Sequence, residues 1–396
     1  MAVPAKPIRA GRQPTHVEEA EPFAIGELPR RIEPAAEVAH PLAAGRYQSP
    51  LRYPGAKSGL AKIIGELVES ATLSPQVRQI DMLVEPFAGG AATALRLAGA
   101  GVVERVLLAD ADPLVAAFWQ VAAARTDELI DRISDEYANY VAAGGTTALE
   151  RWDYWRAWHP NGTRGRRADD LDLAVKCLFL NRTTFSGILH GRAGPIGGRR
   201  QESAYGIGCR FNVDALTQRL EYVGHLYETN RLVDVWRSDW KDTLQGVATW
   251  YKALLPDRVV AYLDPPYLSK SGKLYRQSFD KTSRSEAGVD LDWTAPLQHY
   301  QLARFLRTEM QFRWILSYDF DPLLLEEEGL YASKAMHPSV EVREMLGVRS
   351  WRISKRKVTL NYTASSRTGR GAAAELLLTT LPPSTVPNNH RLSGIS

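Results

Sequence analysis

Two consecutive strand–turn–helix units in the first third of the chain limit its fold most strongly. The apolar run 80–84 ends at Glu85 and is followed by a glycine-containing turn and a helical stretch. The next run, 102–109, is rich in β-forming residues and stops at Asp110, and a second helix follows Pro113. Short strands that alternate with helices build parallel sheets with helices on their faces. We therefore expect an α/β chain whose polar turns meet at the carboxyl edge of one sheet.

The later pattern indicates one sheet domain with a single insertion. Aromatic-rich helical pieces flank a Gly- and Arg-rich loop in the middle of the chain, after which apolar strands return. The termini are rich in Pro and lack a sustained period, so we expect a disordered arm and tail there. The expected division is an arm over 1–46, a sheet domain over 47–150 and 231–381, a mostly helical insertion over 151–230 and a tail over 382–396.

Composition excludes several classes of protein. Hydrophobic residues make up 44% and charged residues 24%, which is ordinary for a soluble globular chain and argues against wholesale disorder. The two cysteines are too few for a disulfide framework or a thiolate zinc site. No run of about eighteen apolar residues and no signal-peptide pattern occurs. We expect a cytoplasmic protein with no membrane association and no metal site.

The turn Asp-Pro-Pro-Tyr, residues 264–267, directly follows the apolar strand 259–263. The Asp264 side chain and the Pro265 carbonyl can accept hydrogen bonds from one amino group, which aims its lone pair at an electrophilic methyl group. Pro265 and Pro266 fix the backbone, and Tyr267 offers a flat face for a base. Such catalysis needs only orientation and electrostatic preorganisation. The alternative is that the prolines merely end a strand and Tyr267 is a core aromatic residue.

Acidic residues also end the two earlier strands. Glu85 opens the turn Glu-Pro-Phe-Ala-Gly-Gly, whose glycines let the backbone approach a ligand near an electropositive helix N-terminus. Asp110 stands where nucleoside-binding sheets place an acid that accepts hydrogen bonds from ribose hydroxyls. Helix capping ahead of Pro113 is the other role open to an acid here, and we assign it to Asp112.

In this order the segments resemble the Dam-type family of DNA adenine-N6 methyltransferases, over about residues 49–381. Residues 51–57, Leu-Arg-Tyr-Pro-Gly-Ala-Lys, resemble the family's N-terminal cofactor motif, and residues 264–267 match its catalytic tetrapeptide. Residues 238–240 resemble the segment that meets the adenine of the cofactor. The resemblance implies a Rossmann-like catalytic domain that uses S-adenosyl-L-methionine, with an inserted target-recognition region. The implied catalytic residues are Asp264, Pro265, Pro266 and Tyr267, and the implied cofactor-binding residues are Tyr53, Pro54, Gly55, Lys57, Glu85, Phe87, Ala88, Gly89, Asp110, Asp239, Trp240 and Asp264.

Residues 181–188, Asn-Arg-Thr-Thr-Phe-Ser-Gly-Ile, resemble the family's DNA-reading hairpin, in which an aromatic residue at the place of Phe185 stacks into the duplex. An apolar wedge beside arginine and small hydroxyl residues suits an enzyme that must take adenine out of the base stack. Two basic stretches, 192–210 and 352–370, suit phosphate contacts, although scattered arginines are also typical of a solvated loop. The implied DNA-binding residues are Asn181, Arg182, Thr184, Phe185, Ser186, His190, Arg192, Arg199, Arg210, Lys355, Arg356 and Lys357.

The match has departures, and alternatives stay open. Ala56 and Ala91 stand where the family commonly has Gly, and His190 where members that read GATC usually have Arg, so that specificity is not carried over. The expected activity is site-specific methylation of adenine N6 in double-stranded DNA. The alternatives are a cytosine-N4 or RNA adenine methyltransferase of the same fold, and a DNA-binding regulator with weak turnover. The resemblance leaves open whether a restriction endonuclease or another defence component accompanies the enzyme.

Overall fold

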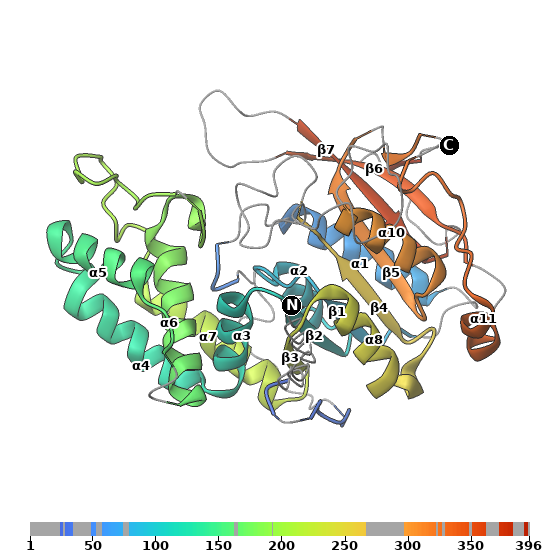
Figure 1. The fold of residues 1–396 in the computed structure, drawn as a ribbon, viewed down its shortest axis with the longest axis horizontal. Coiled ribbons are helices and arrows are strands. Elements are labelled where there is room, and N and C mark those ends of the chain that lie inside the picture. The colour runs from blue at the N-terminus through green and yellow to red at the C-terminus, as the bar shows by residue number, and fades with distance from the viewer. Residues whose placement is uncertain are drawn as a thin grey trace, which may run out of the picture.

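The computed structural model describes residues 24–26, 28–34, 49–52, 58–73, 79–161, 165–191, 193–266, 297–321, 324–326, 329–347, 351–361, 372–382 and 392–394. Within these residues one eight-stranded sheet forms the centre of the molecule, in the order β3-β2-β1-β4-β5-β7-β6-β8 (Figure 1). The strands are β1 Met82–Glu85, β2 Arg105–Asp110, β3 Leu232–Arg237, β4 Val259–Leu263, β5 Arg313–Asp319, β6 Ser354–Asn361, β7 Ala372–Thr379 and β8 Leu392–Gly394.

Strands β1 to β5 are parallel, and β7 lies antiparallel between β5 and β6. The chain runs outward from β1 through β2 to β3, and then returns to the other side of β1 as β4. Open α/β sheets bind ligands at such a reversal of strand order, outside the carboxyl ends of the strands. The predicted α/β fold class is therefore confirmed, and the topology places the β1 and β4 turns at the reversal.

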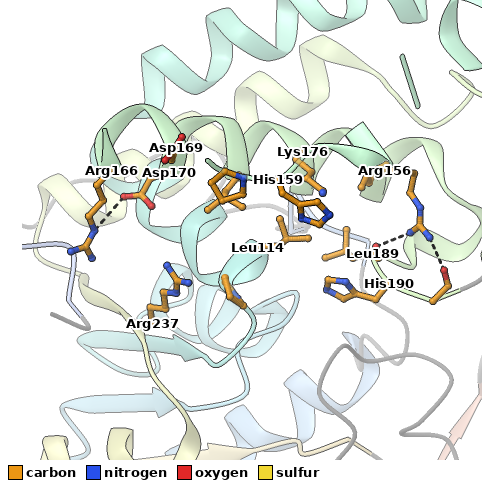
Figure 2. Close-up of a pocket in the computed structure, with 15 residues that line it drawn as sticks. Leu114, Arg156, His159, Arg166, Asp169, Asp170, Lys176, Leu189, His190 and Arg237 are labelled. Carbon is orange, nitrogen blue, oxygen red and sulfur yellow. Dashed lines mark hydrogen bonds and ion pairs between the residues drawn. The ribbon is translucent and has the colours of Figure 1, made fainter. Parts of the chain in front are cut away.

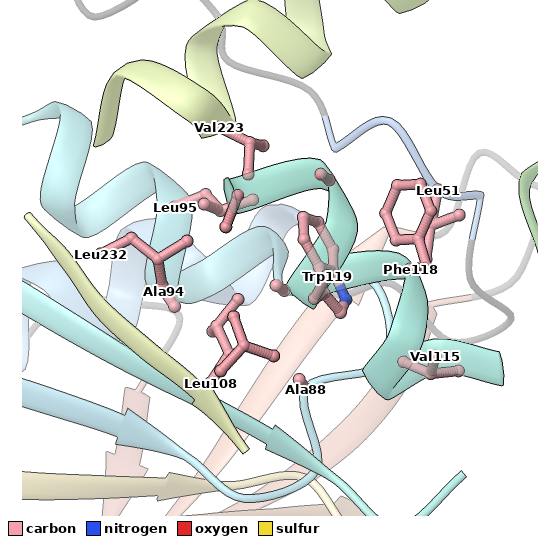
Figure 3. Packing of buried hydrophobic residues seen from close by; sticks show 14 of the residues in the cluster. Leu51, Ala88, Ala94, Leu95, Leu108, Val115, Phe118, Trp119, Val223 and Leu232 are labelled. Atoms are coloured by element: carbon pink, nitrogen blue, oxygen red, sulfur yellow. The ribbon is translucent and has the colours of Figure 1, made fainter. Parts of the chain in front are cut away.

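Helices cover both faces of the sheet because the strands alternate their apolar side chains. Leu83, Val106 and Leu108 face one hydrophobic cluster, whereas Val84 and Leu107 face the other. Helices α1, α2, α3 and α7 pack in the first cluster, and Figure 3 shows Phe118 and Trp119 of α3 among its residues. Helices α8 and α10 pack in the second. The bounds are α1 Ser58–Thr72, α2 Ala92–Gly99, α3 Pro113–Ala124, α7 Val213–Glu228, α8 Trp240–Trp250, α10 Leu297–Thr308 and, after β5, α11 Val340–Leu346.

The predicted insertion is helical, but the helical layer begins earlier than expected. It consists of α4 Thr126–Glu136, a π-helical turn Tyr137–Val141, α5 Gly145–Ala157 and α6 Arg166–Thr183. Helix α6 packs against α3, α4 and α5, so the layer is continuous with the sheet domain. In Figure 1 the green helices α4, α5 and α6 lie on the opposite side of the molecule from β6 and β7. The expected boundary between residues 150 and 151 falls inside α5.

The expectation of a disordered N-terminal arm is wrong for residues 24–26 and 28–34, which pack against the β3 edge. The backbone amides of Ile25 and Arg30 donate to the carboxylate of Asp234 at 3.2 and 3.3 Å. The Arg30 guanidinium also lies 4.0 Å from the centre of the Tyr227 ring. Asp234 is fully buried in β3. Because this carboxylate is far from the arm in the sequence, the local composition of the arm cannot reveal the contact.

Two expectations for the C-terminal part also need correction. As the last apolar run of the sequence, 375–381 predicts the closing strand, but it contributes β7, which lies inside the sheet between β5 and β6. Residues 392–394 of the expected tail form β8, which pairs antiparallel with β6. The basic stretch around residues 354–361 supplies β6 itself. In the part of the chain that is described, no helix has the length and apolar character needed to cross a membrane.

Candidate active site

Three acidic side chains converge at the carboxyl edge of the sheet. Met82 of β1 pairs with Arg105 of β2 and with Val259 of β4, so the three parallel strands run in register. Their ends carry Glu85, Asp110 and Asp264. The expected meeting of these turns at one edge is confirmed.

Glu85 is buried at the N-terminus of α2. Only 4% of its surface is exposed, and its Oε2 accepts a hydrogen bond of 3.3 Å from the backbone amide of Ala94, in the first turn of the helix. Burial, and then the charge of nearby Asp264, raise the pKa of Glu85 well above its usual value, although the bond from Ala94 opposes the rise. A ligand cation placed here would reverse that effect.

Asp110 holds the glycine turn against the end of β2. Its two carboxylate oxygens accept from the backbone amides of Gly89 and Asp112 at 2.9 and 2.8 Å. The indole of buried Trp119 donates to the Gly89 carbonyl at 2.9 Å, so this glycine is fixed from two sides. Burial, and then the neighbouring charge of Asp112, raise the pKa of Asp110 to about 7.

Ala91 ends this turn in a strained conformation. Its φ of 46° and ψ of 28° lie in the left-handed region, as does the φ of 44° at Gly89. A residue with a side chain is disfavoured there by about 1–2 kcal/mol. This strain is a physical reason why glycine would be preferred at position 91.

Two further aspartates cap helices beside the site. Asp112 accepts from the backbone amide of Leu114 at 3.0 Å, which confirms its assignment as the cap of α3. Asp239 is exposed and accepts from the amides of Lys241 and Asp242 at 2.8 and 2.9 Å at the start of α8. Trp240 is buried and packs edge-on against Phe305 at 5.5 Å between ring centres.

Asp264 follows β4 and receives a hydrogen bond that the sequence did not predict. The hydroxyl of Ser317, on the neighbouring strand β5, donates to Asp264 Oδ1 at 3.0 Å. Pro265 is buried and Pro266 is half-buried behind it. The other predicted site residues Tyr53, Pro54, Gly55, Lys57, Arg192 and Tyr267 lie outside the described residues.

The predicted DNA-reading segment is built on a buried clamp. Asn181 is fully buried: its Oδ1 accepts from the Arg52 amide, and its Nδ2 donates to the Arg52 carbonyl, both at 2.7 Å. Nδ2 also donates to the Gly187 carbonyl at 3.1 Å. Buried Arg182 donates to the Pro50 carbonyl. These two side chains therefore tie the insertion to residues 50–52, at the start of the predicted cofactor motif, and do not lie at the surface.

Phe185 is the exposed member of the same segment. Its side chain is 62% exposed, and the following Ser186 adopts a left-handed conformation with φ of 58°. The Phe185 amide donates to the Gly194 carbonyl at 2.9 Å, and buried Thr184 accepts from the indole of Trp152 at 3.0 Å. A rigid base thus presents an exposed aromatic ring.

The predicted phosphate-contacting residues have mixed surroundings. Arg199 is exposed but pairs with Asp153 at 2.6 and 2.8 Å, and Arg210 is exposed. His190 contacts Asp112. On β6, Lys355 is buried and donates to the Ala332 carbonyl at 2.7 Å, Arg356 is half-buried, and Lys357 lies 4.5 Å from the centre of the Phe320 ring.

A cavity of about 570 Å³ lies between the sheet domain and the insertion (Figure 2). Figure 2 shows Arg166 and Arg237 at one end, and Leu189, His190 and Arg156 at the other. Four arginine or lysine side chains and two histidines line it together with two carboxylates, and this excess of basic groups suits an anionic ligand. These eight residues are Arg156, His159, Arg166, Lys176, His190, Arg237, Asp169 and Asp170. Among the described residues, His, Cys, Asp and Glu form no group of three that could hold a metal ion.

The comparison with known families now decides the class of protein. Residues 53–191 match the model of the family described as D12 class N6 adenine-specific DNA methyltransferase. The match indicates an adenine-specific DNA methyltransferase. It confirms the resemblance to Dam-type enzymes, favours adenine over cytosine as the acceptor, and makes double-stranded DNA the partner. No curated protein matches the chain.

The matched range contains only part of the site of this methyltransferase. It includes Glu85, Asp110 and the segment around Phe185, and it ends before β3. The sheet, with antiparallel β7 beside β5, is consistent with the Rossmann-like methyltransferase fold over the remaining strands. The roles of Asp264 and Ser317 therefore rest on geometry.

We predict that Asp110→Asn flattens the dependence of stability on pH. The pKa of this carboxyl is about 7 in the folded chain against an ordinary value of 3.8, so the folded state holds a proton that the unfolded state has lost. The stabilisation is complete below pH of about 4 and is lost as pH rises towards about 7. Urea unfolding across this range should show a steeper fall in the free energy of unfolding for the wild type. Equal slopes would contradict the assignment.

We predict that Asn181→Ala lowers the free energy of unfolding by about 3 kcal/mol, because three backbone groups, at Arg52 and Gly187, lose a buried partner. Asn212→Ala is the matched control in the same insertion. Asn212 is exposed and makes one capping bond of 2.9 Å to Ala215, which is worth about 1 kcal/mol. Urea denaturation of the two variants compares them, and an equal loss would show that the clamp is unimportant.

Proposed function

We propose that this methyltransferase transfers a methyl group from S-adenosyl-L-methionine to the N6 amino group of adenine at specific sites in double-stranded DNA, after the base has turned out of the duplex. The observation that supports this most strongly is the convergence of Glu85, Asp110 and Asp264 at one sheet edge, in a chain that matches an adenine methyltransferase family. In this proposal Glu85, Asp110 and Asp264 each bind a different group of the cofactor or of the target adenine.

The acidic side chains at this edge of the sheet suit S-adenosyl-L-methionine as the cofactor. S-adenosyl-L-methionine supplies an electrophilic methyl group on a positively charged sulfur and also carries an ammonium group and a ribose. Two buried or half-buried carboxyl groups with raised pKa values, Glu85 and Asp110, favour a ligand that brings positive charge and hydroxyl donors. Asp110 would hold the ribose, and the turn at Gly89 lets the backbone lie close to the ligand. Asp239 and Trp240, at the N-terminus of α8, are proposed to border the adenine of the cofactor.

Asp264 and the Pro265 carbonyl are proposed to hold the adenine amine. Two acceptors on one amino group fix its two hydrogens, so the nitrogen lone pair points at the methyl group. S-adenosyl-L-methionine would supply the methyl group: the bond from nitrogen to the methyl carbon would form as the bond from carbon to sulfur breaks. S-adenosyl-L-homocysteine would leave, and the proton lost from the amine would pass to solvent. Asp264 stabilises the positive charge that develops on the amine. No covalent enzyme intermediate is needed.

DNA is proposed to lie across the insertion and the cavity beside it. Phe185 projects from a rigid base and can fill the space that a displaced adenine leaves. The basic side chains of the cavity, such as Arg237 and Arg166, would face the phosphate backbone. Asn181 and Arg182 take part indirectly, because they fix the base of the wedge.

We predict that Asp264→Asn lowers methyl transfer by about 1,000-fold, because the amide offers a weaker acceptor and no charge to the amine. DNA affinity should change by less than about threefold, since Asp264 lies at the end of β4, away from the insertion. The rate is measured with radiolabelled cofactor, and affinity by fluorescence anisotropy. A variant that keeps most of the wild-type rate would refute the catalytic role of this residue.

We predict that Phe185→Ala lowers kcat/KM for DNA by about 10- to 100-fold, because base–aromatic stacking is worth about 1–3 kcal/mol. Its effect on the free energy of unfolding should stay within about 0.5 kcal/mol, as the ring is 62% exposed. Val340→Ala, at a 52% exposed position on α11, is the control and should leave both quantities unchanged. Normal kcat/KM in Phe185→Ala would remove the wedge from the mechanism.

A further inference from the structure

A chain of three side chains leads from the sheet interior to the proposed catalytic carboxylate. Tyr262 on β4 and Ser317 on β5 have 1% and 0% of their surface exposed. Their hydroxyl oxygens lie 3.1 Å apart, and Ser317 donates to Asp264 Oδ1 at 3.0 Å. Hydroxyl groups buried in an apolar sheet cost free energy unless they are hydrogen-bonded, so this chain is a specific feature of the site.

The direction of the hydrogen bonds follows from the chemistry of the three groups. A carboxylate only accepts, so the single hydrogen of Ser317 must point at Asp264. The Ser317 oxygen is then an acceptor, and the Tyr262 hydroxyl must be the donor to it. Each bond polarises the next, which strengthens the donor that reaches the carboxylate.

The neighbouring strands explain why Asp264 needs this support. Strand β4 lies between β1 and β5, so Asp264 has Glu85 on one side and Ser317 on the other. The charge of Asp264 acts on the Glu85 carboxyl from the β1 side. A donor from β5 compensates the Asp264 charge and draws Oδ1 toward β5, which sets the orientation of the whole carboxylate that is proposed to accept from the adenine amine.

We propose that Ser317 is a positioning residue for methyl transfer, which orients the Asp264 carboxylate through Oδ1, and that Tyr262 fixes the Ser317 hydroxyl in the donating orientation. This inference rests on the proposed function, since it concerns the carboxylate that holds the amine. Ser317 touches neither DNA nor cofactor in this account. Loss of the Ser317 hydroxyl changes the orientation of the Asp264 carboxylate but leaves the carboxylate in the site.

The test is a comparison of Ser317→Ala and Tyr262→Phe with two controls that remove a hydroxyl elsewhere. Ser134→Ala deletes a serine hydroxyl that donates to the Ile130 carbonyl at 2.8 Å in α4. Tyr251→Phe removes the hydroxyl of buried Tyr251, which donates to the Arg30 carbonyl at 3.0 Å near the β3 edge. Ser317→Ala and Ser134→Ala each remove a serine hydroxyl, and Tyr262→Phe and Tyr251→Phe each remove a tyrosine hydroxyl. A general loss of stability therefore affects both variants of a pair.

We expect kcat of Ser317→Ala to fall by about 10- to 100-fold with KM for DNA changed by less than about twofold, because a misplaced catalytic group costs rate and not substrate affinity. Tyr262→Phe should lose about two- to fivefold in kcat, since its effect passes through Ser317. Ser317→Thr, which keeps the hydroxyl, should restore most of the rate if it folds. The two controls should keep the wild-type kcat.

A binding measurement provides a readout that does not depend on methyl transfer. Duplexes that carry adenine or purine at the target position differ only by the N6 amine, so the ratio of their dissociation constants reports the hold on that amine. We expect Ser317→Ala to shift this ratio in the same direction as Asp264→Asn and by a smaller factor, within about twofold, whereas Ser134→Ala leaves it at the wild-type value.

The outcomes separate this inference from the proposed function. If Asp264→Asn abolishes transfer but Ser317→Ala and Tyr262→Phe match their controls in kcat and in the binding ratio, the positioning role is wrong and the proposed function stands. If the wild type transfers no methyl group to adenine, the proposed function fails. If Asp264→Asn keeps its rate, the catalytic role of Asp264, on which this inference depends, fails instead. If Ser317→Ala does not fold, Tyr262→Phe decides: a kcat equal to that of Tyr251→Phe overturns the inference.

Discussion

The shared register of β1 with β2 and β4 is the constraint on which the site depends. Because the three strands are parallel and paired without a gap, the residues that follow them have to meet at one edge of the sheet. Burial there makes charge costly, and the acids raise the pKa of one another: Asp264 acts on Glu85, and Asp112 acts on Asp110. The edge is thus prepared for a ligand that carries positive charge and hydrogen-bond donors, and this requirement agrees with an adenine methyltransferase.

The same constraint explains the division of labour between local and long-range interactions. Hydrogen bonds between near neighbours shape the turns, such as the one that Asp110 accepts from the Asp112 amide. Long-range bonds then hold the turns in place, as Ser317 does for Asp264 and Trp119 for Gly89. The insertion is joined to the sheet domain in a similar way, through Asn181 and the backbone at Arg52.

Features with a local signature could be predicted from the sequence, and features that depend on distant partners could not. The apolar runs located the parallel strands, and the spacing before Pro113 was enough to assign Asp112 as a helix cap. Asn181 and Arg182 were expected at the DNA surface because their sequence context resembles a DNA-reading segment. Their partners at residues 50–52 are about 130 positions away, and only the fold reveals that they are buried. The docking of Ile25 onto Asp234 was missed for the same reason.

The most direct test of the central claim is a chemical analysis of DNA from cells that express the protein. Nucleosides released from that DNA and from DNA of cells that express Asp264→Asn are compared by mass spectrometry. The account predicts N6-methyladenine in the first sample, a background level in the second, and no increase of N4-methylcytosine in either. Methylated cytosine, or equal methyladenine in the two samples, would contradict it.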